Sequence, residues 1–114
     1  MSMRTRRTEA AYSRAKQDGS LRPLADEYHL REWKYWVLID NRFPHDLHHT
    51  KNHLLVRKKK GSIYSLRLWE WAELLEIYHE LKLDYDYLKL NFPSVISVPE
   101  CLHFHLLTLK DRYK

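Results

Sequence analysis

Polar and apolar residues alternate near the C-terminus, and this alternation constrains the fold more than any other feature. In the stretch Cys-Leu-His-Phe-His-Leu over residues 101–106, every second side chain is apolar. Side chains two positions apart in a β-strand point to the same face. The pattern therefore predicts a strand over residues 99–109. Its polar face carries Cys101, His103 and His105, and its apolar face carries Leu102, Phe104 and Leu106.

Two strands are predicted upstream of this segment. Residues 33–39 (WKYWVLI) are rich in aromatic and β-branched side chains, and they run into a turn at residues 40–44. Residues 53–56 (HLLV) form the second predicted strand, after a polar loop at residues 45–52. The segment 84–93 fits either a further strand or a short helical turn.

A long helix is predicted before the C-terminal strand. Apolar residues recur at helical spacing over residues 65–81, and Ser65 is the expected N-cap. The side chains expected on its packed face are Leu68, Trp71, Ala72, Leu75 and Tyr78. The order of strand, strand, helix and strand indicates an α+β fold, in which one long helix packs on an antiparallel sheet.

The chain divides into a short extension and one domain. Its 114 residues are enough for a single core, which we expect over residues 24–114. Residues 1–23 are polar and basic. Within them, residues 8–16 are predicted to form a short helix with Thr8 as its N-cap, or else to stay loose.

Charge and cysteine content limit the partners and the compartment. The formal net charge of +5 suits a polyanionic partner, such as a nucleotide or a nucleic acid, but solubility alone also explains it. The basic run at residues 57–60 is either a solvated strand end or a contact for such a polyanion. Cys101 is the one cysteine, so no intrachain disulfide can form and the cytoplasm is expected. No apolar run reaches the roughly 18 residues that span a bilayer, so no membrane contact is expected.

The polar face of the C-terminal strand allows three interpretations. The first is a pair of structural histidines on a half-exposed strand. The second is a zinc site, because Cys101, His103 and His105 offer three donors and His53 could add a fourth. Structural zinc, however, usually takes its ligands from tight turns. The third is a functional surface, since buried polar groups need partners and such a cluster is costly inside a core.

Three segments together resemble the histidine-triad (HIT) superfamily of nucleotide-binding proteins. Residues 101–107 (CLHFHLL) resemble the signature His-φ-His-φ-His-φ-φ, where φ is apolar. Residues 39–44 (IDNRFP) resemble the family's strand and Asn-Arg-x-Pro turn, and residues 53–56 resemble its His-φ-φ-φ strand. The resemblance covers residues 33–110. It implies a HIT-like antiparallel sheet with one long helix on it and a short N-terminal helix.

The resemblance also implies roles for individual residues. By position, His103 is the nucleophile that attacks an α-phosphorus and forms a covalent nucleotidyl-histidine, while a backbone carbonyl of the same strand holds its other ring nitrogen. The residues implied to contact phosphate or to support that contact are His105, His53, Cys101, Ser97 and Asn91. Asn41 is implied to bind the ribose hydroxyls, and a turn residue is an equally good interpretation of it.

The chain departs from the family pattern at several positions. Cys101 replaces the first histidine, and because a thiol is a weak hydrogen-bonding group, reduced activity is implied. Arg57 stands where proline is usual, Lys60 stands where many members have a histidine, and residues 93–99 lack the family's glycine-rich approach. The loop histidines are expected to be solvated, with a lid over the phosphates as the alternative. They are His45, His48 and His49.

The implied function is hydrolysis or nucleotidyl transfer on a phosphoramidate, a dinucleoside polyphosphate or another conjugate of an AMP- or GMP-type nucleotide. No cofactor and no metal are implied, whereas a homodimer is, since family members commonly pair their sheets edge to edge. The alternatives are a nucleotide-binding protein without catalysis and a nucleic-acid-binding protein. The catalytic hypothesis requires His53 to share one polar surface with His103 and His105. A His53 that faces away, or two rings sealed inside hydrocarbon, would contradict it.

Overall fold

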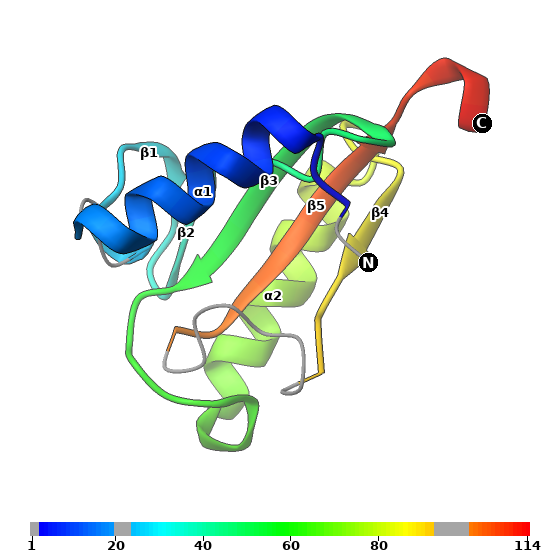
Figure 1. The fold of residues 1–114 in the computed structure, drawn as a ribbon. Helices are drawn as coiled ribbons and strands as arrows, with labels where there is room; N and C mark the ends of the chain where they lie inside the picture. The colour runs from blue at the N-terminus through cyan, green and yellow to red at the C-terminus, as the bar shows by residue number, and fades with distance from the viewer. Residues whose placement is uncertain (1–2, 20–23, 93–100) are drawn as a thin grey trace.

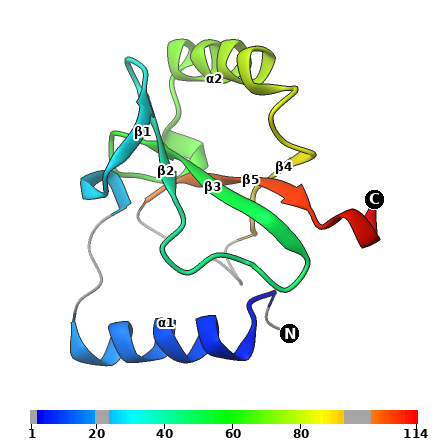
Figure 2. The ribbon, with the colours of Figure 1, turned by 90° about the horizontal axis from the view of Figure 1, so that it is seen from above.

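The chain forms one sheet with a helix on each side (Figure 1). The computed structural model describes residues 3–19, 24–92 and 101–114. The strands are β1 (His29–Glu32), β2 (Trp36–Asp40), β3 (His49–Arg57), β4 (Tyr87–Lys89) and β5 (His103–Leu109), and the helices are α1 (Arg6–Asp18) and α2 (Leu68–Leu81). Each strand is antiparallel to its neighbours, in the order β1-β2-β3-β5-β4. The predicted α+β class is therefore confirmed. Figure 2 shows α2 on one side of the sheet and α1 on the other.

The strand predictions hold best at the C-terminus. β5 has the predicted apolar face, which is buried in the main core under α2. β3 begins at His49 rather than at residue 53. The prediction of a loop over residues 45–52 is therefore wrong for residues 49–52. The ambiguous segment 84–93 contains the strand β4. β1 was not predicted, because this short strand is largely exposed and leaves no apolar pattern.

The main core lies between the sheet and α2. Its buried members are Trp36, Leu38, Leu55, Leu74, Ile77, Leu81, Leu102, Phe104 and Leu106. A smaller apolar cluster lies on the opposite face of the sheet and contains Val37, Ile39, Leu54, Val56 and Cys101. The central strands are therefore buried on both faces. The two faces differ in the polar side chains that they carry.

The predicted packed face of α2 is wrong. Leu68 and Leu75 are 83% and 68% exposed, and the other members of that face are exposed as well. The buried side chains are instead Glu70, Leu74, Ile77 and Leu81. The sequence pattern predicted the wrong face because the buried stripe begins with a carboxylate, Glu70. Despite these exposed apolar residues, neither helix in the described ranges is long and apolar enough to cross a membrane.

A buried ion pair joins the end of β3 to the start of α2. Arg57 donates from Nε to Glu70 Oε2 (2.6 Å) and from Nη2 to Oε1 (2.8 Å), and both side chains are at most 1% exposed. Ser65, the expected N-cap, instead accepts a hydrogen bond from Arg57 Nη1 (2.6 Å). The helix begins after Arg67, whose backbone N–H donates to Glu70 Oε1 (3.1 Å). Arg57 is thus not solvated, whereas residues 58–60 are exposed.

The N-terminal segment docks on the loop before β3. Helix α1 is capped by Thr5, whose hydroxyl accepts from the N–H of Thr8 (3.3 Å), so the predicted cap was three residues too late. Asp46 accepts hydrogen bonds from the Thr5 N–H (2.7 Å) and from the Thr8 hydroxyl (2.6 Å). Tyr12 meets the ring of Phe43 edge on. These contacts hold the N-terminal segment against the loop that contains His45.

Candidate functional site

Strand β5 presents His103 and His105 on the face of the sheet opposite α2. In the sheet register, His105 pairs with Leu54 of β3 and with Lys89 of β4, and His103 pairs with Val56. Directly paired residues of antiparallel strands share a face. The two imidazoles are only 8% and 5% exposed, and their ring centroids lie 5.4 Å apart. Because both rings are buried, each needs a polar partner.

One hydrogen bond fixes the proton of His103. Its Nδ1 lies 2.8 Å from the backbone oxygen of Cys101. A carbonyl oxygen can only accept, so Nδ1 carries the proton and Nε2 keeps its lone pair. Burial also lowers the pKa of His103, which keeps the ring neutral and its Nε2 nucleophilic. The resemblance implied a backbone carbonyl of the same strand; the observed carbonyl lies just before that strand, because β5 begins at His103 rather than at residue 99.

A network of side-chain amides fixes the opposite tautomer in His105. The Oδ1 of Asn52 accepts from the backbone N–H of His45 (3.0 Å) and from Nδ2 of Asn41 (2.9 Å). Since the amide oxygen faces these donors, the amide nitrogen faces Nδ1 of His105, at 3.2 Å, and donates to it. The proton of neutral His105 therefore resides on Nε2. The two imidazoles thus offer one Nε2 lone pair and one Nε2–H donor.

The prediction that His53 joins this pair is wrong. Neighbouring side chains in a strand point to opposite faces, and β3 directs Asn52 towards His105, so His53 lies on the α2 side. There its Nδ1 lies 2.6 Å from the Tyr85 hydroxyl, and the two rings meet edge on. Sequence reasoning missed Asn52, because residues 54–56 are apolar on both faces and no alternation marks the register.

The third imidazole of the cluster comes from His45, in the loop before β3. Its ring stacks on His105 with the centroids 4.6 Å apart, and it is 9% exposed. The expectation of a solvated side chain is therefore wrong for His45. It is also wrong for His49, which is buried, with Nδ1 2.8 Å from the His45 backbone oxygen and Nε2 in contact with the Tyr87 hydroxyl. His48 keeps partial exposure.

Cations lie beside the neutral imidazoles. Burial lowers the pKa of His45 to about 4, and the charges of Lys89 and Arg4 add to this effect. Burial lowers the pKa of His105 to about 2, with further contributions from His45, His103 and the same two cations. A positive field that disfavours protonated imidazole favours a bound anion. Burial is the larger cause of both shifts, and the charges of Lys89 and Arg4 are the part that suits an anionic ligand.

The remaining predicted residues have different surroundings. Asn41 forms a turn, because its Oδ1 accepts from the N–H of Phe43 (3.0 Å), and this bond favours the turn interpretation over ribose binding. Asn91 lies two residues beyond β4 and is half-buried. Cys101 packs in the smaller apolar cluster. Ser97 lies outside the described residues. Phosphate contacts of Asn91, Cys101 and Ser97 stay predictions.

The zinc interpretation gains no support from this geometry. The zinc and catalytic interpretations both use His103 and His105. Each of these rings has one nitrogen in a hydrogen bond within the protein. The fourth donor it invoked, His53, lies on the other face of the sheet. Across the described ranges, no group of three or more His, Cys, Asp or Glu residues is placed to hold a metal ion.

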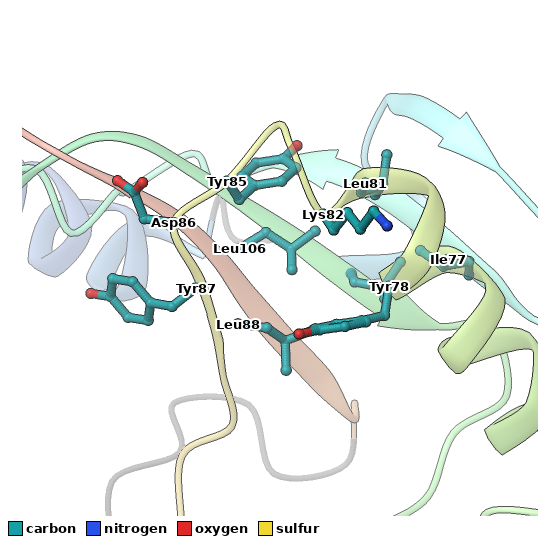
Figure 3. Close-up of a pocket in the computed structure, with 10 residues that line it drawn as sticks. Ile77, Tyr78, Leu81, Lys82, Tyr85, Asp86, Tyr87, Leu88 and Leu106 are labelled. Carbon is teal, nitrogen blue, oxygen red and sulfur yellow. The ribbon is translucent and has the colours of Figure 1, made fainter.

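A pocket of about 350 Å³ lies on the other side of the sheet, between α2 and β4 (Figure 3). Tyr78 of α2 and Lys82, just after its last residue, border it on one side, and Tyr85 and Leu88 border it on the other. None of its described lining residues is a histidine, and the lining is mainly apolar. This pocket is therefore separate from the histidine cluster.

Comparisons with known proteins identify no relative of this chain. No family model matches this sequence, and neither a curated protein nor a solved structure matches it. The functional interpretation is therefore based on the sequence motifs and on the geometry of the cluster.

Proposed function

We propose that this chain is a HIT-type nucleotide hydrolase or nucleotidyl transferase, in which His103 attacks the α-phosphorus of a nucleotide conjugate. The observation that carries the proposal is a pair of adjacent imidazoles with opposite tautomers. His103 offers a lone pair on Nε2, and His105 offers a proton on Nε2. Displacement at phosphorus needs a nucleophile and a donor for the phosphoryl oxygen.

The bonds change in two steps. First, the lone pair of His103 Nε2 forms a bond to phosphorus, and the leaving group departs with the electron pair of its bond to phosphorus. The Nδ1 proton stays on His103, where the oxygen of Cys101 stabilises the positive charge that develops on the ring. His105 donates to a phosphoryl oxygen. Water or an acceptor alcohol then attacks phosphorus and loses a proton to solvent, and the electron pair of the N–P bond returns to Nε2.

The fold also supports this proposal. An antiparallel sheet, with one helix before β1 and one between β3 and β4 in the chain, agrees with the arrangement that the HIT resemblance implies, except that the N-terminal helix is not short: α1 has 13 residues and α2 has 14. The strand with the signature-like residues is central in the sheet. It pairs with β3 at both histidines and with β4 at His105.

The proposal differs from the sequence hypothesis in one respect. That hypothesis required His53 on the polar surface, and in this form it fails. Asn52 and His45 stand in its place, the first by orienting His105 and the second by stacking on it. These two neighbours give the buried His105 ring a polar surrounding, whereas the buried His103 ring pairs with Val56 and has the Cys101 backbone oxygen as its polar contact.

Covalent labelling tests the proposal. The purified chain is incubated with adenosine and guanosine phosphoramidates and with dinucleoside polyphosphates, and products are followed together with intact mass spectrometry at neutral pH. We expect turnover, and an added nucleotidyl group on the peptide that contains His103. Turnover without this label would contradict the covalent mechanism. Binding of AMP or GMP by calorimetry, without turnover or label, would identify a nucleotide-binding protein that has no catalysis.

A further inference from the structure

We infer that the histidine cluster holds a second anion beside the α-phosphate, and that the leaving group of the substrate is therefore itself a phosphate, joined through a phosphoanhydride bond. This inference rests on the proposed function and selects among its substrate classes. Lys89, His45 and Arg4 form this second-anion subsite, next to His105.

Lys89 contributes the charge of the subsite. Its pairing with His105 places its side chain on the histidine face of the sheet. Its ammonium lies 3.4 Å from the Sδ of Met3, which is a weak acceptor, and no carboxylate of the described residues forms an ion pair with it. Burial, and then the charge of Arg4, lower the pKa of Lys89. The Lys89 side chain is half-buried, and a bound phosphate would supply its ammonium with an anionic partner.

An unpartnered nitrogen of His45 points to a ligand at the same place. Its Nδ1 is buried and has no hydrogen-bond partner among the described residues. Buried polar atoms are normally paired, so such an atom in a native fold requires an explanation. The ring stacks on His105, which pairs with Lys89. If neutral His45 carries its proton on Nδ1, an anion beside the ring would accept hydrogen bonds from this nitrogen and from the ammonium of Lys89.

Arg4 adds a second cation from the N-terminal segment. Its Nε donates to the backbone oxygen of Phe43 (2.7 Å), two residues before His45. Its Nη1 lies 3.7 Å from Glu9, which offsets part of its charge. Lys89 therefore contributes most of the uncompensated charge, and Arg4 borders the subsite.

The charge of the leaving group decides between the substrate classes. An amine that leaves a phosphoramidate must take up a proton and can become cationic, so Lys89 would repel it. A phosphate leaves with the electron pair of the broken bond between the α-phosphorus and the bridging oxygen, and it needs no proton. The ammonium of Lys89 stabilises the negative charge that gathers on this leaving phosphate.

Binding of inorganic pyrophosphate tests the subsite without turnover. We expect calorimetry to detect binding to the wild type and to His103→Ala, and Lys89→Met to weaken it about 10-fold or more, because a charge-assisted hydrogen bond is lost. Lys89→Arg should keep most of the affinity, and Lys59→Met, which changes an exposed lysine, should keep all of it. Thermal unfolding shows whether each variant is folded. No binding to the wild type, or equal affinity in Lys89→Met, would overturn the subsite.

Turnover separates failure of the subsite from failure of the proposed function. Lys89→Met should lower kcat/KM about 10-fold or more for a dinucleoside polyphosphate, and less than about threefold for an adenosine phosphoramidate. Equal losses on the two substrates would overturn the assignment of Lys89 to the leaving group. If pyrophosphate binding depends on Lys89 but the wild type turns over neither substrate, the subsite stands and the proposed function fails.

Discussion

Replacing His103 with alanine is expected to lower turnover on the order of 10⁴-fold or more, and to remove the covalent label. The variant loses the Nε2 lone pair that forms the bond to phosphorus, and the adjacent imidazole of β5, His105, offers no equivalent atom at Nε2. His105 carries its proton on Nε2, because Asn52 donates to its Nδ1. The measurement is steady-state turnover of the best substrate from the panel, together with intact mass spectrometry.

Two variants control this experiment. His103→Asn keeps a polar side chain in the buried position, and it should be as inactive as the alanine variant if nucleophilicity is what matters. His79→Ala removes an exposed histidine of α2 and should leave turnover unchanged. Turnover within about tenfold of the wild type in folded His103→Asn would exclude His103 as the nucleophile, since loss of a nucleophile costs far more than that.

Replacing Glu70 with glutamine is expected to lower the free energy of unfolding by about 3–5 kcal/mol, because a buried guanidinium loses its counter-ion. Arg57 forms two hydrogen bonds to this carboxylate, and both side chains are at most 1% exposed. The hydrogen bond from Arg57 is the main cause that lowers the pKa of Glu70 to about 2. Its folded pKa is depressed, so the carboxylate contributes stability above its ordinary pKa, and this is lost as the pH falls towards about 2.

Denaturant unfolding of a small set of variants tests this assignment. Glu76→Gln, on an exposed position of α2, should change the free energy of unfolding by no more than about 0.5 kcal/mol. The double variant Arg57→Met with Glu70→Leu removes both charges together, so it should regain much of the stability lost in Glu70→Gln. A Glu70→Gln variant as stable as Glu76→Gln would show that the ion pair contributes little.

The sequence predicted β5 and its two faces because polar and apolar residues alternate there in a strict period of two. The same logic failed in β3, where residues 54–56 are apolar on both faces. The register then decides whether Asn52 or His53 points at the signature histidines, and only pairing with β5 fixes that register. Loop residues such as His45 carry no periodic signal at all, and tertiary contacts alone place this ring on His105.

The error in α2 has a different physical origin. A carboxylate counts as polar in any periodic pattern, yet Glu70 is buried because Arg57 neutralises it from a strand 13 residues away. With Glu70 read as solvent-facing, the stripe of Leu68, Leu75 and Tyr78 was the better candidate for the packed face. The ion pair with Arg57 allows Glu70 to be buried, so the face that also carries Leu74, Ile77 and Leu81 is the packed one. Charge pairing between distant segments cannot be read from helical spacing.

Nitrogen-15 NMR spectra of the histidine rings test the central claim most directly, since they report which ring nitrogen carries the proton. Near neutral pH, His103 should carry its proton on Nδ1 and His105 should carry its proton on Nε2. As the pH is lowered to about 5, His105 should stay neutral, because burial lowers its pKa to about 2. Two rings with the same tautomer, or a His105 that is already protonated near neutral pH, would contradict the proposed division of roles.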